Sequence, residues 1–260
     1  FCLSRGLGDV YKRQHERTVN GVKGVLFNVW APKALSVSVV GEFNKYDGRV
    51  HLMERIEDTG VFELFIPGLA AGCGYMYEIK RQGKGTTRKL DPVSRQISSV
   101  PITASVVSDE NMPDSYAWND GLWMIKRKKE AGKKKPVTVY EVSLTDWLKE
   151  KSADELVDFV KQEGYTHVCF LPVAEYLNEE MNGYSTLGYF AVTHRTGGSD
   201  AFKKLVDDCH NAGIGVIIDW NGAYFGTEVK GLYDFDGADA YGYLKPSLEK
   251  HPEWDVVTFD

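Results

Sequence analysis

The chain has 260 residues, of which 43% are hydrophobic and 12% aromatic, and its formal net charge is -6 at pH 7. This composition excludes global disorder, and the acidic balance argues against a dedicated nucleic-acid partner. No apolar run is long enough to cross a bilayer, so we expect no membrane contact. The cysteines form no metal-ligand pairs and indicate free thiols in a cytoplasmic protein without metal or cofactor; they are Cys2, Cys73, Cys169 and Cys209.

The first residues do not resemble part of a domain. Residues 9–14 read DVYKRQ, which resembles the translated end of a transposon adapter used in sequencing libraries. We therefore interpret residues 1–14 as an adapter scar and the chain as a gene fragment. This segment is left out of the fold prediction.

Residues 15–107 predict an antiparallel β-sandwich. Short strands of alternating hydrophobicity are expected over 25–32, 35–43, 61–68 and 74–81, separated by Gly, Pro, Asn and Asp. In the second of these strands, Leu35, Val37 and Val39 are expected on one face. We expect this module, from about residue 19, to fold independently.

Residues 108–135 predict a linker between domains. The segment is polar, and six lysines and one arginine lie between residues 126 and 135. A basic run of this kind can bind nucleic acid, but this one has no interleaved aromatic residues and the rest of the chain is acidic. We interpret it as a solvated interdomain loop.

From residue 136 onward the pattern predicts alternating strands and helices. Buried apolar strands are expected over 137–142, 166–173 and 213–220, and helices over 152–164 and 199–213. Ser152 and Glu155 form a capping box for the first helix, and Ser199 or Asp200 is expected to cap the second. Continuous apolar strands that alternate with helices predict a parallel sheet.

Two folds satisfy this alternation, a doubly wound sheet and a (β/α)8 TIM barrel. Polar and aromatic residues follow each strand, and a long excursion over 174–198 follows the second, which favours the barrel. The predicted fold class is therefore multidomain β plus α/β. An N-terminal antiparallel β-sandwich precedes the first part of a (β/α)8 TIM barrel over residues 136–260, truncated after about three strands.

Two segments carry residues suited to chemistry. The third strand ends on Asp219 and Trp220, which places a carboxylate and an aromatic ring where a βα barrel keeps its active site. Alternatively, Asp219 only hydrogen-bonds neighbouring loops. The long excursion contains Tyr184, Tyr189 and Phe190, whose rings suit the apolar face of a sugar. Tyr189 and Phe190 can instead anchor this loop to the barrel rim.

Five separated motifs are YEVSLTDW (140–147), LPVAEY (171–176), NGYSTLGYFAVTHRTGG (182–198), LVDDCHNAGIGVIIDW (205–220) and HPEWDVVTFD (251–260). Together they resemble the 1,4-α-glucan (glycogen) branching enzymes of the α-amylase superfamily. Upstream, VWAPKALSVSVVGEFNKYDGR (29–49) resembles the sandwich that precedes the barrel in such enzymes. The resemblance implies a sandwich of the carbohydrate-binding-module type and a transferase of glycogen biosynthesis that acts on α-1,4-glucan.

The resemblance also implies roles for residues. Members of this family cleave an α-1,4 link with retention and pass the glucan to a 6-hydroxyl, using an Asp nucleophile and a Glu acid/base. Those carboxylates come from later barrel strands, so we expect them beyond Asp260 and name no catalytic residue here. Tyr184 matches the sugar-stacking Tyr, Asp219 matches the first site Asp, and Tyr224 replaces a sugar-binding His. With Trp220, these residues form the predicted substrate-binding site.

Other positions also depart from the family. Ser143 stands where a His is usual, Asn182 where an aromatic residue is usual, Ser185 where Gln is usual and Tyr46 where Trp is common. An alternative is therefore a divergent paralogue that binds α-glucan with weak or no transfer. A related glycoside hydrolase of the superfamily, or an unrelated interaction protein on this fold, are further alternatives. Because three strands leave an open edge, we expect residues 136–260 alone to aggregate.

Overall fold

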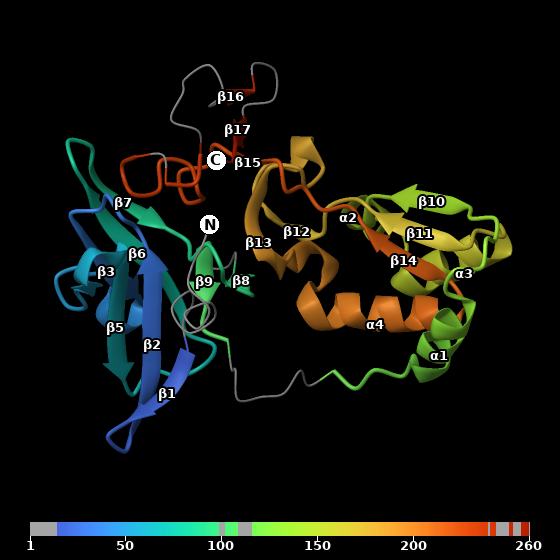
Figure 1. Cartoon of the computed structure of the whole chain (residues 1–260), viewed down its shortest axis with the longest axis horizontal. Helices are drawn as coiled ribbons and strands as arrows, with labels where there is room; N and C mark the ends of the chain where they lie inside the picture. The colour runs from blue at the N-terminus through green and yellow to red at the C-terminus, as the bar shows by residue number, and fades with distance from the viewer. Residues whose placement is uncertain are drawn as a thin grey trace.

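The computed structural model describes residues 15–98, 102–108, 116–238, 240–242, 250–251 and 256–259. The segment 1–14, predicted as an adapter scar, lies outside the described residues, as do positions 252–255 and 260 of the HPEWDVVTFD motif and positions 109–115 of the linker. The described chain forms two lobes, a β-sandwich and an α/β lobe, with β12 and β13 between them (Figure 1).

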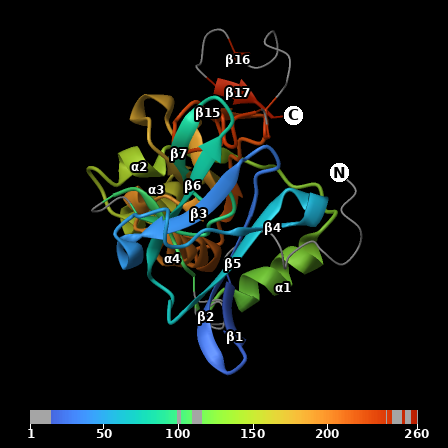
Figure 2. The same cartoon turned by 90° about the vertical axis from the view of Figure 1, so that its left-hand side faces the viewer.

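The sandwich lobe consists of two antiparallel sheets (Figure 2). The first sheet has the order β1 (His15–Val19), β2 (Val22–Trp30), β5 (Val61–Pro67) and β4 (Glu54–Ile56). The second contains β3 (Ser36–Gly41), β6 (Gly74–Arg81), β7 (Gly85–Lys89), β9 (Ala104–Val106) and β8 (Ile97–Ser98). Two short 3-10 turns, η1 (Glu42–Asn44) and η2 (Glu57–Thr59), connect strands.

The sandwich core follows the alternation of its strands. Inward residues of β2, β3 and β6 form one buried cluster that includes Val25, Phe27, Val29, Val37, Val39, Tyr75, Tyr77 and Ile79. The prediction for Leu35 was wrong, because this residue precedes β3 and is 56% exposed. Residues two apart on a strand share a face only while the strand continues.

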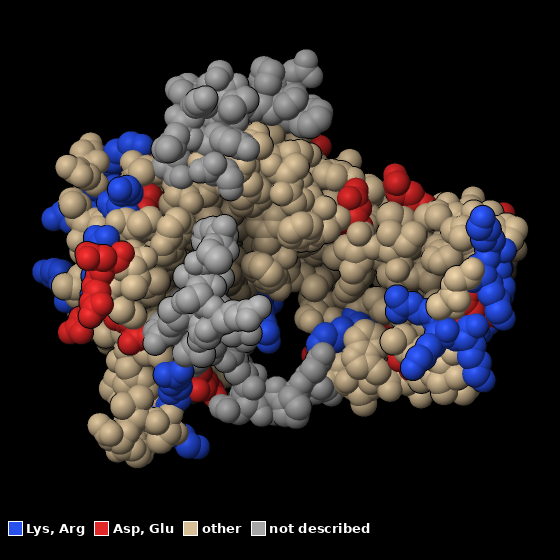
Figure 3. Space-filling model, in the orientation of Figure 1, with Lys and Arg blue, Asp and Glu red and all other residues tan. Residues whose placement is uncertain are grey.

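The linker contains a helix, so its prediction as a loop was wrong for residues 121–130. Seven of the ten residues of helix α1 (Gly121–Glu130) are Leu, Met, Lys, Arg or Glu, which have high helix propensity. Its last turn carries Arg127, Lys128 and Lys129, whose charges suit the negative end of the helix dipole. The ring of Trp123 stacks on His210 of the α/β lobe, with centroids 5.0 Å apart. Figure 3 shows Lys and Arg gathered at this end of the molecule.

The α/β lobe is built on a parallel sheet with the order β10-β11-β14. Its elements are β10 (Val139–Val142), α2 (Leu144–Trp147), α3 (Ala153–Gln162), β11 (His167–Phe170), α4 (Gly198–Asn211) and β14 (Gly215–Ile218). Helices α3 and α4 both pack in one cluster with Val142, Val168 and Phe170. Sequential strands with both helices on one face are the arrangement of a βα barrel.

The excursion after β11 forms an antiparallel pair of its own. It contains β12 (Ala174–Tyr176), η3 (Glu179–Met181), β13 (Thr186–Val192) and η4 (His194–Thr196). After β14, a small sheet joins β15 (Tyr224–Gly226), β17 (Val256–Thr258) and β16 (Lys250–His251). No helix in the described part of the chain is long and apolar enough to cross a membrane.

The two predicted helix caps have different outcomes. Ser152 caps α3 in a full capping box, since its hydroxyl accepts from the Glu155 amide while the Glu155 carboxylate accepts from the Ser152 amide. For α4 the prediction was wrong. The cap position is Gly197, in the left-handed conformation, and Ser199 and Asp200 lie inside the first turn. Gly197 also ends the preceding turn η4, and its left-handed conformation is one that favours glycine.

Strand β14 is less buried than predicted. Ile217 is 40% exposed and Ile218 is 46% exposed, because β14 is the edge strand of the described parallel sheet. In the described residues, β14 pairs with β11 on one side and with no strand on the other.

The capping box gives a first test of the fold. We expect Ser152→Ala to lower the free energy of unfolding of the α/β lobe by about 1 kcal/mol, because the first turn of α3 loses a hydrogen-bond acceptor. Urea denaturation followed by far-UV circular dichroism measures the change. Ser199→Ala is the matched control, since Ser199 is exposed and caps nothing, and equal losses in the two variants would contradict the assignment.

Candidate functional site

The register of the parallel sheet sorts its residues onto two faces. Glu141, Cys169 and Ile217 lie in one row across the three strands. The neighbouring row, which contains Val142 and Phe170, faces the helices, and the Phe170 and Phe202 rings are 5.5 Å apart. Because consecutive strand residues point to opposite faces, the Glu141 row faces away from the helices. In a closed barrel this is the interior face.

Asp219 continues this interior face at the carboxyl end of β14. Its amide donates to the Phe170 carbonyl at 2.9 Å, which extends the ladder to Asp219. Its carboxylate accepts a short hydrogen bond from the Tyr184 hydroxyl. This bond, burial and the Asp219 charge all raise the pKa of Tyr184, so the phenol stays protonated at neutral pH. The structure therefore brings two predicted site residues into direct contact.

Asn221 holds the backbone around this pair. Its side-chain amide donates to the carbonyls of Tyr184 and Tyr224, at 3.0 Å each, and its side-chain oxygen accepts from the Ala223 amide at 3.2 Å. Asn221 is only 9% exposed. Sequence reasoning missed this role, although a buried amide directly after a strand-end carboxylate is a usable signal.

Tyr224 begins β15 beside the pair. Its carbonyl accepts from the Tyr189 hydroxyl at 2.6 Å. Burial raises the pKa of Tyr189, and Glu228 and Tyr224 add to that effect. Tyr224 also contributes to the raised pKa of Tyr184, after Asp219, burial and Glu141. Tyr224, which stands where the family has a His, thus lies next to both Tyr184 and Tyr189.

Trp220 does not join the Tyr184–Asp219 pair. It is 60% exposed, and its ring meets Tyr189 edge-on at 6.0 Å. Beside it lies a cavity of about 190 Å³ whose lining includes Phe190, Ile218 and Phe202. Of the two rings predicted as possible rim anchors, Tyr189 is anchored by its hydroxyl, whereas Phe190 is 60% exposed.

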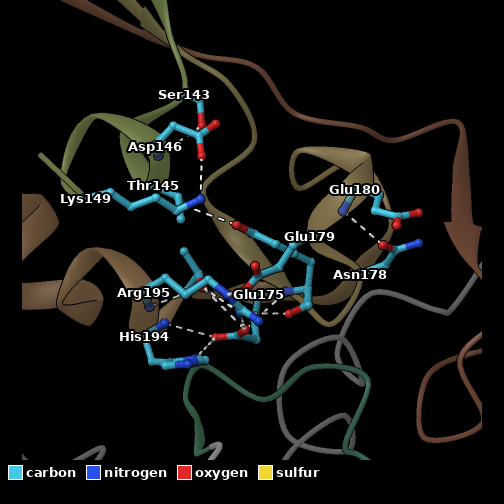
Figure 4. A network of polar contacts seen from close by, with 12 residues as sticks. Ser143, Thr145, Asp146, Lys149, Glu175, Asn178, Glu179, Glu180, His194 and Arg195 are labelled. Carbon is cyan, nitrogen blue, oxygen red and sulfur yellow. Dashed lines mark hydrogen bonds and ion pairs between the residues drawn. The ribbon is translucent and has the colours of Figure 1, made fainter.

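A buried carboxylate fixes the loop that carries Tyr184 (Figure 4). Glu175 is 2% exposed and accepts from Arg195 Nη1 at 2.8 Å. It also accepts from the His194 amide at 3.0 Å and the Thr193 hydroxyl at 3.3 Å, and it contacts the His194 ring. A buried charge is tolerated only with such partners, so this network is structural and ties β12 to η4.

The departures from the family pattern have local roles. The Ser143 hydroxyl caps α2 by accepting from the Asp146 amide at 3.3 Å. Asn182 ends η3 in the left-handed conformation, which Asn tolerates better than an aromatic residue does. The Ser185 hydroxyl donates to Glu228 at 2.5 Å, and the Tyr46 ring lies 5.5 Å from the Arg88 guanidinium carbon.

Glu141, which is exposed, and Cys169, which is half-buried, lie on the sheet face of Asp219, although the sequence did not point to them as site residues. Burial raises the pKa of the Cys169 thiol, and the charges of Glu141 and Asp219 raise it further. Cys169 therefore lies close enough to Glu141 and Asp219 for both charges to influence its ionisation. Among the described residues, no three His, Cys, Asp or Glu side chains are grouped to hold a metal ion.

This shared environment is testable through Cys169. We expect Glu141→Gln to speed alkylation of Cys169 at pH 8, because loss of a nearby negative charge lowers the thiol pKa and raises the thiolate fraction. Peptide mass spectrometry after iodoacetamide labelling measures the rate at this residue alone. Glu150→Gln removes an exposed charge in the turn after α2 and serves as control. Equal rates in the Glu141→Gln protein and the parent would contradict the shared face.

Residues 7–94 match the family model described as carbohydrate-binding module 48, the isoamylase N-terminal domain. The chain is also similar to the crystal structure of an alpha-amylase candidate from Salmonella typhimurium, with a TM-score of 0.66 and 24% identity, over 90% of this chain and 36% of that one. These likenesses confirm the predicted fold class, a β-sandwich followed by part of an amylase-like barrel.

Curated relatives agree with the predicted resemblance. The chain is 41% identical over 256 residues to the 1,4-alpha-glucan branching enzyme GlgB of Methylococcus capsulatus, and equally to that of Nitrosococcus oceani. The relative from Gloeobacter violaceus is 41% identical over 258 residues. The alignment with the first two covers 95% of this chain and 34% of each relative, so the chain spans about a third of their length. Over nearly its whole length, the chain is a homologue of the 1,4-alpha-glucan branching enzymes.

Proposed function

We propose that the chain forms the glucan-binding module and the first side of the sugar pocket of a 1,4-α-glucan branching enzyme. The observation that carries the proposal is the contact between the Tyr184 hydroxyl and the Asp219 carboxylate at the carboxyl end of β14. This places a flat ring and a fixed hydrogen-bond acceptor side by side. A sugar needs these two groups, one for its apolar face and one for its hydroxyls.

The proposed reaction is transglycosylation with retention. It requires a carboxylate nucleophile and a carboxylic acid that acts first as acid and then as base. We assign neither group to this chain and expect both beyond Asp260. Tyr184 and Asp219 would orient the sugar at the cleavage point, so that the nucleophile meets the anomeric carbon in line.

The chain has three parts in the proposed organisation. We propose a sandwich domain over 15–107, a linker over 108–135 and an incomplete barrel over 136–260. The matched carbohydrate-binding module and the branching-enzyme relatives support α-glucan as the partner. The absence of nucleic-acid and membrane partners and the cytoplasmic location stay predictions. Cys73, Cys169 and Cys209 are free thiols, which agrees with a reducing compartment.

Glucan binding by the chain itself is the direct test. We expect Asp219→Asn to weaken retention in glycogen affinity gels by about tenfold, because a charge-assisted acceptor is lost beside Tyr184. Native electrophoresis across a range of glycogen concentrations gives the dissociation constant. The control, Asp200→Asn, removes an exposed carboxylate in the first turn of α4. Binding that is equal in all three proteins would exclude Asp219 from the sugar pocket.

A second candidate function is glucan binding without transfer. The observation that favours it is Tyr224, which replaces a His and acts electrostatically on the Tyr184 phenol. A phenol is longer than an imidazole and cannot carry a positive charge, so it would contact a bound sugar differently. In this case the pocket would hold glucan while turnover is slow or absent.

The full-length gene product distinguishes the two candidates. If it is a branching enzyme, it lowers the absorbance of the amylose–iodine complex, because new branches shorten the linear helices that bind iodine. If it is a binding paralogue, the spectrum stays unchanged although glycogen retards the protein. In that second case, we expect Tyr224→His to restore measurable branching. An inactive Tyr224→His protein would show that Tyr224 is not the sole cause.

A further inference from the structure

A segment beyond the sugar pocket returns to the sandwich lobe. We call residues 228–238 the tether segment. In Figure 1 this part of the chain, in red, lies beside β7 of the sandwich. The Leu90 amide donates to the Lys230 carbonyl at 2.8 Å, and Lys230 Nζ donates to the Thr103 carbonyl at 3.2 Å. The segment follows β15 directly, so it connects the loop that carries Tyr224 to the other lobe.

Phe235 inserts into the sandwich core. It is 0% exposed and belongs to the same buried cluster as Val29, Tyr75 and Tyr77. Its ring meets Tyr241 edge-on at 5.3 Å. A buried phenylalanine is among the largest single apolar contributions to a core, so the α/β part of the sequence completes the core of the sandwich.

Polar contacts fix the same segment on both sides of Phe235. The Asp236 carboxylate, also 0% exposed, accepts from the Lys33 amide at 2.8 Å. Asp234 forms ion pairs with Arg81 at 2.6 Å and Lys84 at 2.9 Å. The buried Lys89 ammonium donates to the Tyr233 carbonyl. These bonds specify one docked position, since a shifted segment would leave buried charges unpaired.

The tether segment also packs, through Leu232, against β15, the strand that begins at Tyr224. Phe225, which follows Tyr224, is buried in one cluster with Leu232 and Val257, and Tyr241 packs against that cluster. Tyr241 also packs against the sandwich core, and its ring meets Trp30 at 5.9 Å. A continuous series of packed side chains therefore joins the Tyr224 loop to the sandwich.

The loop that carries Tyr184 rests on the sandwich as well. Leu187 and Ala191 of β13 are buried in one cluster with Val40 and Met76 of the sandwich. At Gly188, an added Cβ would lie 2.3 Å from the Ile97 Cδ1 atom, so a larger residue here would force the Ile97 side chain of the sandwich to move. Both loops that flank Asp219 are thus held from outside the α/β lobe.

We propose that the sandwich positions the sugar pocket, with Phe235 and Asp236 as the positioning residues that hold the Tyr224 loop in place. The mechanical part of this proposal stands on the contacts alone. The statement that undocking weakens glucan binding rests on the proposed function of the pocket. The two parts therefore have separate readouts.

Hydrogen–deuterium exchange of the 260-residue chain tests the mechanical part. We expect Phe235→Ala and Asp236→Asn to speed amide exchange over residues 221–226 by about tenfold, the size of a typical coupling between sites. Exchange in β11 and α3 should stay unchanged. Asp236→Asn removes the charge with almost no change in volume, so it keeps the test valid if Phe235→Ala unfolds the sandwich.

The matched control removes core volume away from the tether segment. Ile66→Ala affects the same cluster, but Ile66 pairs with Val25, at the opposite end of β2 from Trp30. It should destabilise the sandwich while exchange over 221–226 stays slow. Phe235→Leu should restore much of the protection, because an apolar side chain again fills the site. Unchanged exchange over 221–226 in both tether variants, or equal acceleration in Ile66→Ala, would overturn the proposal.

Glucan binding separates this proposal from the function of the pocket. With maltoheptaose as probe, we expect the dissociation constant of Asp236→Asn to rise about fivefold over the parent. By reciprocity, saturating maltoheptaose should slow exchange over residues 233–238 in the parent chain. If the tether variants loosen residues 221–226 but the parent shows no binding dependent on Asp219, the positioning holds and the proposed function fails. If the parent binds maltoheptaose and neither Phe235→Ala nor Asp236→Asn changes the dissociation constant, the proposed coupling between the tether segment and the sugar pocket is wrong.

Discussion

The register of the three parallel strands decides where the chemistry of this chain lies. Because β10, β11 and β14 pair without a shift, Glu141, Cys169 and Ile217 share a row, and Asp219 follows on the same face. A slip of one residue would turn Asp219 toward the helices, where its carboxylate has no polar partner. The helix-facing row packs with α3 and α4 and makes that slip unfavourable. Hydrophobic packing on one face thus places the carboxylate on the other.

Local signals in the sequence predicted most of the architecture. Alternating apolar residues located the main sandwich strands, and the Ser152 capping box located α3. Asp219 was found because a carboxylate directly after an apolar strand is a local pattern. The α4 cap was missed because the left-handed Gly197 replaces a side-chain cap, and α1 was missed because its lysines suggest a loop as readily as a helix.

Long-range contacts were not predictable from those signals. Phe235 lies in a polar, turn-rich stretch of sequence, yet it is wholly buried in a core whose other buried members lie between Val25 and Val107. Asn221 and Glu175 likewise depend on partners that only the folded chain brings near. The resemblance to a family located Tyr184 and Tyr224, but it could not show that Ser143 and Asn182 are occupied with capping roles of their own.

The buried Phe235 has a consequence for how such proteins are recombined. Carbohydrate-binding modules are often treated as interchangeable cassettes that a linker joins to an enzyme. Here the boundary in sequence and the boundary in packing differ, because one apolar side chain and one carboxylate of the α/β part belong to the sandwich. A chimera cut at the linker would separate Phe235 from the slot that fits it. Exchange of the sandwich between homologues therefore requires exchange of residues 228–238 with it.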